Sequence, residues 1–231
     1  MYKLICFDLD DTLWPCMPTI EHAEKTLYAW MQLNKPYISD NYSIESLRGK
    51  RKDLFKQHPE LIHDLSEARR VHLKQLAGEF GDSTEWVEDA FNVFYQARQQ
   101  VNLFDDVIPV LSQLKADFSL VALTNGNAHI RHTGLAEYFD FQVSAADVQA
   151  AKPDPAMFIQ AMQQAQVDAE QTLHVGDHPL HDIQGAKNAG IDAVWLRRFN
   201  QPWDSELAEP DYAFSSLNQL HNWLQNSGTD A

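Results

Sequence analysis

The feature that most constrains the fold of this chain is an alternation of short apolar runs with helix-length amphipathic stretches. The alternation begins at the N-terminus, stops after the first apolar run, and resumes at about residue 102. Strands and helices in this order are typical of a parallel sheet with helices on both faces. We therefore predict an α/β fold with a Rossmann-like parallel sheet at its core. The predicted strands are residues 3–7, 119–123, 141–143, 172–175, 193–196 and 212–214, and the predicted helices between them are residues 107–116, 128–137, 155–164 and 183–189.

The segment that interrupts the alternation, residues 15–101, shows helical periodicity only. Its apolar residues recur at intervals of three and four, which is typical of helices that bury one face. Asp82, followed three residues later by Glu85, predicts the start of the last helix in this segment. We expect residues 15–101 to be a helical insertion after the first strand of an α/β core made of residues 1–14 and 102–231.

Charge and composition narrow the range of partners. The chain has 33 Asp and Glu residues against 18 Lys and Arg residues, and its net charge is −15. Such an acidic surface repels phosphate backbones, so we expect no nucleic-acid partner. No apolar run approaches the roughly 20 residues that span a bilayer, and we expect no membrane association. The N-terminal apolar run is too short for a secretory signal and the chain has only two cysteines, so the cytoplasm is the expected location.

Polar side chains follow three of the predicted strands directly. Asp8 and Asp10 follow the first strand, Thr124 and Asn125 follow the second, and Asp177 follows a later one. The carboxyl ends of parallel strands lie at one edge of a sheet, where open α/β folds bind their ligands. Close carboxylates repel one another unless one is protonated or a cation lies between them. Ligands that are all oxygen atoms favour Mg²⁺ over zinc.

Two further residues extend this predicted site. Lys152 offers a fixed cation just before a predicted helix, and Asp182 offers another carboxylate. A metal held by carboxylates, a lysine and small hydrogen-bond donors together neutralise the charge of a phosphoryl group. The residues alone therefore indicate a site for a phosphate ester.

The same residues resemble the motifs of a known family. The run DLDDT, which begins at Asp8, resembles the first motif of the haloacid dehalogenase-like hydrolases, most of which are phosphatases. Thr124, Lys152 and the run GDHPLHD at residues 176–182 resemble the second, third and fourth motifs, in the same order. The inserted helical segment resembles the first type of cap in this family. The resemblance implies that the cap closes over Asp8 and that the substrate is a small phosphate ester.

The resemblance also implies roles for the acidic residues. Asp8 resembles the nucleophile that forms an aspartyl-phosphate intermediate, and Asp10 resembles the general acid and base. The implied Mg²⁺ ligands are Asp8, the backbone carbonyl of Asp10, and Asp177. Asp182 resembles a carboxylate behind the ligands, which orients Lys152 or a metal-bound water, although capping of the following helix also fits it.

The implied phosphate-binding residues are Thr124 and Lys152, with Asn125 beside them. His178 and His181 lie between the acidic residues of the fourth motif, where a transition-metal site is an alternative interpretation. We expect instead that these histidines face solvent or the cap, because the metal site of the family uses oxygen ligands only.

Several functions remain open within and beyond this family. A phosphomutase would keep all four motifs, whereas a haloacid dehalogenase needs the nucleophile but not a second acid at position 10. A binding or scaffold protein on a decayed enzyme fold is the alternative from a different class, but none of the expected catalytic residues is lost. The oligomeric state is not indicated by the sequence.

The wider pattern resembles the bacterial flavin mononucleotide phosphatases, which are linked to a phosphate of the riboflavin pathway. Matching stretches include residues 7–14, 124–128 and 134–141, all in the predicted core. Flavin mononucleotide or a related riboflavin-pathway phosphate is therefore the substrate we expect. Trp14 lies next to the first motif and is a candidate for stacking on a flat ring.

Overall fold

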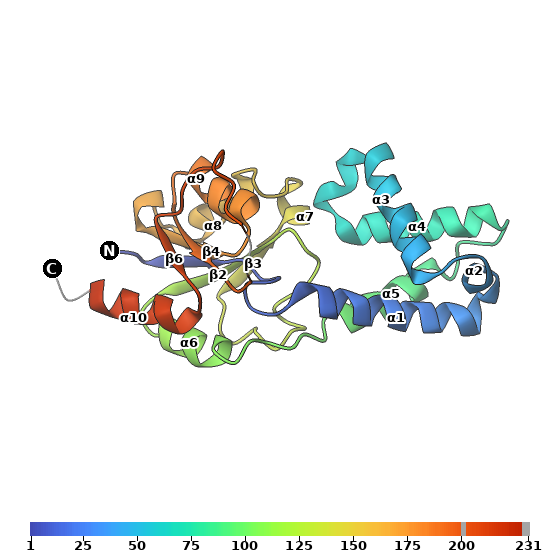
Figure 1. Ribbon diagram of the computed structural model, residues 1–231, viewed down its shortest axis with the longest axis horizontal. Coiled ribbons are helices and arrows are strands. Elements are labelled where there is room, and N and C mark those ends of the chain that lie inside the picture. The colour runs from blue at the N-terminus through green and yellow to red at the C-terminus, as the bar shows by residue number, and fades with distance from the viewer. Residues whose placement is uncertain (200–201, 228–231) are drawn as a thin grey trace. The chain divides into compact units, whose positions relative to one another are not determined.

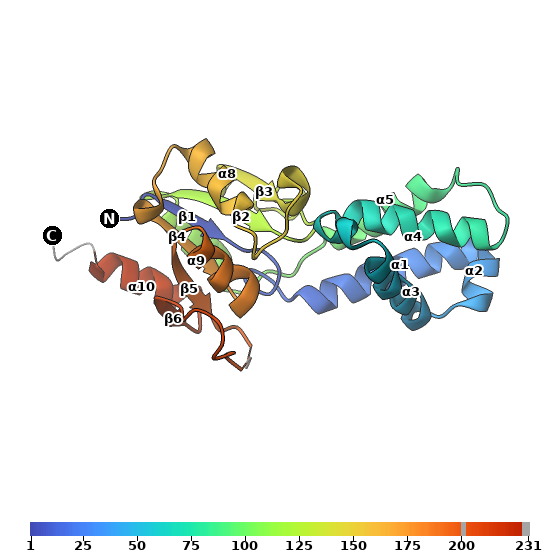
Figure 2. The ribbon, with the colours of Figure 1, turned by 90° about the horizontal axis from the view of Figure 1, so that it is seen from above.

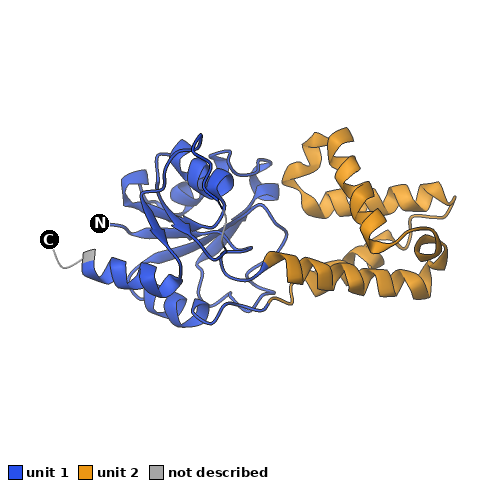
Figure 3. Ribbon diagram, in the orientation of Figure 1, with its two compact units in different colours: residues 1–15, 102–231 blue, residues 16–101 orange. Residues whose placement is uncertain are grey.

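A computed structural model describes residues 1–199 and 202–227 of the chain. The described chain divides into two compact units (Figure 3). One unit contains residues 1–15 and the chain from residue 102 onward, and the other contains residues 16–101. We call them the core unit and the cap unit and describe each by itself.

The core unit contains a six-stranded parallel sheet with the strand order β3-β2-β1-β4-β5-β6. The fold class and all six predicted strands are confirmed, to within one residue at each end. Because β1 lies between β2 and β4, its last residue, Phe7, pairs with Ala122 on one side and Val175 on the other. The residues after these strands therefore meet at one edge of the sheet. The strands are β1 (Leu4–Phe7), β2 (Ser119–Thr124), β3 (Phe141–Ser144), β4 (Thr172–Gly176), β5 (Asp192–Leu196) and β6 (Tyr212–Phe214).

Helices cover both faces of this sheet (Figures 1 and 2). The helices α8 and α9 lie on one face, where Phe158 and Ile183 pack with Leu4 and Cys6 of the central strand. The helices α6 and α10 lie on the other face and contact each other. The helical elements of this unit are α6 (Val107–Leu114), α7 (Ala145–Val148), α8 (Ala156–Ala165), η2 (Ala169–Gln171), η3 (Pro179–Gln184), α9 (Gly185–Asn188) and α10 (Leu217–Ser227).

One predicted helix of the core is wrong. Residues 128–137 form a series of turns instead of a helix. Gly134 within this stretch has a φ of 79°, which an α-helix does not allow. The side chain of Gln142 also binds the backbone of the stretch, accepting from Ile130 N at 2.9 Å and donating to Ala128 O at 3.0 Å.

One boundary of the core also differs from the prediction. The helix predicted over residues 183–189 is a short α9, preceded by the π-helical turn η3. Asp182 lies within that turn. The two segments that flank residues 16–101 are joined within the core unit, because Phe104 N donates to Leu13 O at 3.0 Å.

The cap unit contains helices only, as the periodicity predicts. Its apolar residues form their own core, which includes Leu27, Leu73 and Phe94. The last helix starts at Val87 and not near Asp82, because the Asp82 side chain accepts from the next residue instead of capping a helix. The elements are α1 (Cys16–Asn34), α2 (Pro36–Asn41), α3 (Ile44–Gln57), η1 (Pro59–His63), α4 (Leu65–Glu79) and α5 (Val87–Arg98). Among residues 1–199 and 202–227, no helix has the length and apolar character that crossing a bilayer demands.

Candidate active site

A pocket of about 150 Å³ opens at the edge of the sheet where β1, β2 and β4 end. Every site residue predicted from the sequence lines it, and Asp11, Gly126, His178 and His181 complete the lining. The sheet register explains this assembly, since Asp8 N donates to Val175 O at 2.9 Å and so extends the pairing of β1 with β4. The sequence-distant motifs are thus brought together by the ends of neighbouring strands.

Lys152 is the central cation of the pocket and is almost fully buried. Its Nζ donates to one carboxylate oxygen of Asp8 at 2.6 Å, to Asp182 at 2.6 Å and to the Leu123 carbonyl at 3.1 Å. The backbone of Lys152 is fixed by Asn125, whose amide accepts from Lys152 N at 2.8 Å and donates to Lys152 O at 3.0 Å. Burial opposes the charge, but Asp182 and Asp8 raise the pKa of Lys152 above its usual value. Lys152 is therefore a cation held rigidly between two carboxylates.

Asp182 is buried behind Lys152 and has a second partner that the sequence prediction missed. His174, in the middle of β4, brings its Nε2 to 3.0 Å from the same carboxylate oxygen that binds Lys152. The other oxygen of Asp182 accepts from His178 N at 2.9 Å. Burial alone would raise the pKa of Asp182, but Lys152 and His174 together lower it below its usual range. The available sequence signal for His174 was a histidine inside the predicted strand at residues 172–175.

Gly176 leaves the space that Asp182 occupies. A β-carbon on Gly176 would lie 2.2 Å from Cγ and 2.5 Å from Oδ2 of Asp182. Such distances are far inside van der Waals contact. The strand therefore ends in glycine because a carboxylate packs directly against its backbone.

Three carboxylates of the pocket form a group that fits a hard divalent cation. One oxygen each of Asp8, Asp177 and Asp182 lies within 4.8 Å of the others. Burial raises the pKa of Asp8 well above its usual value against the opposing charge of Lys152, and Asp182 and Asp177 add to the increase. Burial, Asp182 and Asp11 likewise raise the pKa of Asp177 to about 7. Lys152 alone thus leaves negative charge uncompensated, and oxygen ligands of this kind suit Mg²⁺.

The loop after β1 fixes Asp10 through a residue whose role was predicted differently. Trp14 is fully buried, and its indole Nε1 donates to Asp10 Oδ1 at 2.9 Å. The expectation that Trp14 stacks on a flat ring is therefore wrong, because no face of the indole is accessible. Asp10 contributes no side-chain atom to the carboxylate group described above. Its neighbour Thr12 donates to Asp177 Oδ1 at 3.3 Å and ties the loop to the end of β4.

The remaining polar residues line the wall of the pocket. Thr124 Oγ1 accepts from Gly126 N at 2.9 Å, which folds the loop after β2. His178 and His181 stack with their ring centroids 4.0 Å apart, and His178 is exposed, as expected. The Nδ1 atom of His178 accepts from Leu180 N and His181 N at 3.2 Å each, so it caps the start of η3.

Comparison with known proteins matches this geometry to one family. Residues 2–190 match the family described as haloacid dehalogenase-like hydrolase. The chain is 31% identical over 224 residues to the 5-amino-6-(5-phospho-D-ribitylamino)uracil phosphatase YigB of Escherichia coli (strain K12), which covers 94% of this chain and 93% of that protein. It is 28% identical over 207 residues to the glyceraldehyde 3-phosphate phosphatase of Methanopyrus kandleri, covering 86% of this chain and 85% of that protein.

A solved structure is similar over nearly the whole chain. The crystal structure titled 2-haloacid dehalogenase from Pseudomonas syringae pv. Tomato DC3000 matches with a TM-score of 0.91 and 38% identity, covering 98% of this chain and 100% of that one. The chain thus has relatives named for phosphate-ester hydrolysis and for dehalogenation. The sheet order, the four polar motifs at its edge and these matches together show that the chain belongs to the haloacid dehalogenase-like hydrolase family.

Proposed function

We propose that the protein is a Mg²⁺-dependent phosphatase that hydrolyses small-molecule phosphate monoesters through an aspartyl-phosphate on Asp8. The observation that carries the proposal is the position of Lys152, which binds one oxygen of Asp8 at 2.6 Å. No residue that the structure describes donates a hydrogen bond to the other oxygen of this carboxylate, which remains available for attack. A buried carboxylate with one oxygen fixed and one available is a positioned nucleophile.

In the first half of the reaction, the available oxygen of Asp8 forms a bond to phosphorus. The bond between phosphorus and the ester oxygen breaks, and Asp10 donates a proton to the departing alkoxide. In the second half, Asp10 takes a proton from water while the water oxygen forms a new bond to phosphorus. The bond between phosphorus and Asp8 then breaks, which releases inorganic phosphate and restores both residues.

Trp14 supports this role of Asp10 by holding one of its carboxyl oxygens at 2.9 Å. A general acid must lie within hydrogen-bond reach of the leaving oxygen, so a fixed orientation favours proton transfer. Trp14 does not line the pocket and acts only through Asp10.

The phosphoryl oxygens would be held by Lys152, by Thr124 and by Asn125, all of which line the pocket. Lys152 supplies the charge, and Asp182 keeps it in place from the buried side. Thr124 and Asn125 come from the end of β2 and Lys152 from the segment before α8, and Asn125 connects the two segments through its bonds to the Lys152 backbone.

Mg²⁺ would be held by a carboxylate oxygen of Asp8, the backbone carbonyl of Asp10 and the carboxylate of Asp177. When bound, it would withdraw charge from the phosphoryl group and lower the repulsion met by the attacking carboxylate. Asp182 belongs to the same group of carboxylates, but its oxygens already accept from Lys152, His174 and His178. We therefore assign it to Lys152 and not to the metal.

Dehalogenation is the second candidate, because a similar structure bears that name. A halide is a weak base that leaves without a proton, whereas an alkoxide needs one. Asp10 lies two residues from Asp8, is oriented by Trp14 and lines the same pocket, so the chain carries the proton donor that only ester hydrolysis requires. This favours the phosphatase.

The substrate we propose is a phosphate ester of the riboflavin pathway, flavin mononucleotide or a related compound. This proposal is supported by the similarity to YigB, a phosphatase named for 5-amino-6-(5-phospho-D-ribitylamino)uracil. The similarity extends over most of the length of both chains. The relative named for glyceraldehyde 3-phosphate is less similar and supports the broader class of small phosphate esters.

The test is release of phosphate with Mg²⁺ from flavin mononucleotide, sugar phosphates, nucleotides and an aryl phosphate, with release of chloride from 2-chloropropionate as a parallel assay. We expect Asp8→Asn and Asp10→Asn to abolish phosphate release. Asp154→Asn is the matched control, because Asp154 does not line the pocket and an asparagine can still accept from Ala156 N. Chloride release without phosphate release would refute the proposal, as would phosphate release that survives Asp8→Asn.

A further inference from the structure

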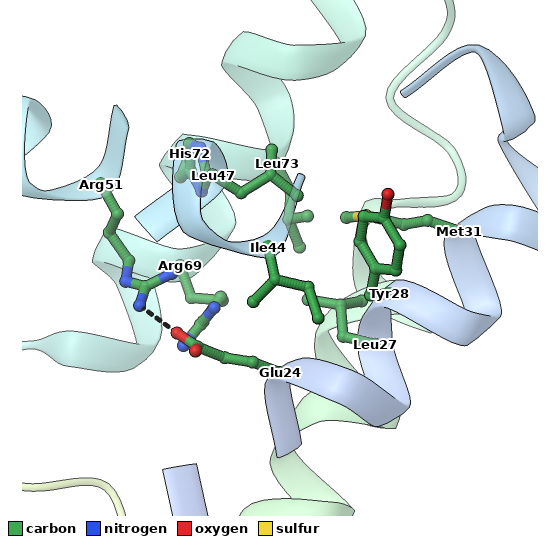
Figure 4. Close-up of a pocket in the computed structure, with 10 residues that line it drawn as sticks. All are labelled: Glu24, Leu27, Tyr28, Met31, Ile44, Leu47, Arg51, Arg69, His72 and Leu73. Atoms are coloured by element: carbon green, nitrogen blue, oxygen red, sulfur yellow. Dashed lines mark hydrogen bonds and ion pairs between the residues drawn. The ribbon is translucent and has the colours of Figure 1, made fainter. Parts of the chain in front are cut away.

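The cap unit contains a second pocket, formed by α1, α3 and α4 (Figure 4). Its two ends differ in chemistry. Glu24, Arg51 and Arg69 gather at one end, and Leu27, Tyr28 and Met31 lie at the other (Figure 4). All of these residues belong to the cap unit, so the pocket is complete without the core.

Arg69 is the residue that needs an explanation. Its side chain is 6% exposed, and its guanidinium stacks on Phe94 with the Cζ atom 3.5 Å from the ring centroid. It forms no hydrogen bond and no ion pair with any residue that the structure describes. Its nitrogen atoms are not among the fully buried polar atoms of the described chain that lack a partner, so the edge of the guanidinium reaches the surface of the pocket with its N–H donors unused by the protein. Arg69 lines the pocket, where an acceptor from outside the chain can reach it.

The nearby carboxylate cannot balance Arg69, because two other arginines already use it. Glu24 Oε1 accepts from Arg51 Nη2 at 2.6 Å. Its Oε2 accepts from Nη2 and Nε of Arg48 at 2.5 and 3.1 Å. Three guanidinium groups therefore surround one carboxylate, which leaves an excess of positive charge in a chain that is otherwise strongly acidic.

His72 lies one turn after Arg69 on α4 and adds a second unsatisfied group. Its side chain is 4% exposed, and its Nε2 atom is buried without a hydrogen-bond partner in the described chain. Burial, with Arg51 and Arg69 nearby, lowers the pKa of His72 to about 3, so the ring is neutral at physiological pH. Burial and Arg51 also lower the pKa of Arg69 well below its usual range, which reflects the same missing negative charge.

The size of the pocket and its other wall define the ligand. Its volume is about 20 Å³, which is room for one or two water-sized groups. That matches the two oxygens of a carboxylate better than the four of a phosphate. The remaining wall is apolar and includes Leu27, Ile44 and Leu73. We propose that the cap pocket binds the carboxylate group of a short aliphatic acid, with Arg69 as the principal donor.

Isothermal titration calorimetry of the full-length chain tests this site without any turnover. The probes are propionate and isobutyrate, with propionamide as a neutral compound of the same shape, in a buffer free of chloride and other carboxylates. The test variant is Arg69→Met, which keeps most of the side-chain stem. Arg70→Met is the matched control, because the adjacent Arg70 also stacks on an aromatic ring, that of Phe91, but is partly exposed and paired with Glu88.

We expect the two carboxylates to bind wild type and Arg70→Met equally, and propionamide not to bind. Arg69→Met should weaken binding by at least about tenfold, since a hydrogen bond to a charged group is worth about that factor or more. Arg69→Lys should restore part of the lost affinity, which would show that binding needs the positive charge. Equal binding to wild type and Arg69→Met would overturn the proposal and move the site elsewhere, for example to Lys152. Absence of binding to wild type at millimolar concentration would overturn it too.

Thermal unfolding of each variant tests whether Arg69→Met has a folding defect. We expect no loss of melting temperature, because replacing a buried charge that lacks an ion pair with an apolar side chain of similar volume is often neutral or stabilising. Since calorimetry needs no catalysis, this proposal can fail while the phosphatase stands, and the phosphatase can fail while this site stands.

Discussion

Replacing Gly176 with alanine is the most direct test of how the site is built. The added β-carbon would lie 2.2 Å from Cγ and 2.5 Å from both Cβ and Oδ2 of Asp182. Asp182 cannot simply swing aside, because its carboxylate is held by Lys152, by His174 and by the backbone of His178. Either the strand end or the carboxylate must shift.

The expected cost follows from these contacts. Forcing a methyl group into a packed interior costs about 1–3 kcal/mol. Displacing Asp182 weakens at least one hydrogen bond to a charged group, which adds about 1.5–3 kcal/mol. We expect Gly176→Ala to lower the free energy of unfolding by about 3–5 kcal/mol. Because Lys152 depends on Asp182 for its position, kcat/KM for the phosphate ester should fall roughly a hundredfold.

Gly49→Ala is the matched control. Gly49 lies inside α3, and a β-carbon there would meet nothing within 4 Å. Alanine should therefore stabilise the chain by about 0.5–1 kcal/mol through its higher helix propensity. Urea unfolding and steady-state kinetics of both variants make the comparison. A Gly176→Ala protein within about 0.5 kcal/mol of wild type, with unchanged kcat/KM, would refute the packing argument.

Two further predictions concern buried charges. Lys152→Met should abolish phosphatase activity. In the presence of a chelator it should also lower the free energy of unfolding by about 3–5 kcal/mol, because Asp8 and Asp182 stay buried without their cation. Urea unfolding measures this loss, and a variant as stable as wild type would contradict the prediction. Glu24→Gln should cost about 1–3 kcal/mol at neutral pH. Burial raises the pKa of Glu24, but the hydrogen bonds from Arg48 and Arg51 lower it by more than burial raises it. The net pKa of Glu24 is therefore below its usual value. A carboxylate of this kind stabilises the fold above its unfolded pKa of about 4.3 and loses that effect as the pH falls through its folded pKa. The difference in melting temperature between wild type and Glu24→Gln should thus shrink in acid, and a difference that grows would contradict the assignment.

The sheet could be predicted from the sequence because its signal is local. Each strand of the core is a short apolar run that ends in polar or turn-forming residues, and the carboxyl-end rule then gathers the polar residues without any knowledge of contacts. The prediction over residues 128–137 was wrong because the backbone there is held by Gln142, a residue outside the stretch, and bent by Gly134. Helical spacing of apolar residues does not reveal such competition.

The roles of individual side chains were also harder to predict from the sequence, because they depend on contacts between residues that no local pattern connects. His174 contacts Asp182 because β4 faces η3, and no spacing rule connects them. Trp14 looked available for stacking because it follows the first motif, whereas the turn of the loop buries it against Asp10. Arg69 was one cation among many in a helical segment, and only its burial on Phe94 separates it from its neighbour Arg70.

The hydrogen bond from Phe104 N to Leu13 O places the two ends of the inserted segment next to each other in the core unit. For the sheet, the whole cap unit is therefore a single long loop closed at its base. The entropic cost of closing a loop rises only with the logarithm of its length, by about 0.6 kcal/mol for each doubling. Once the two ends are held together, inserting a complete domain costs little more loop-closure entropy than inserting a short turn. The insertion point can therefore accept segments of very different size and sequence while the sheet and its carboxylates stay as they are.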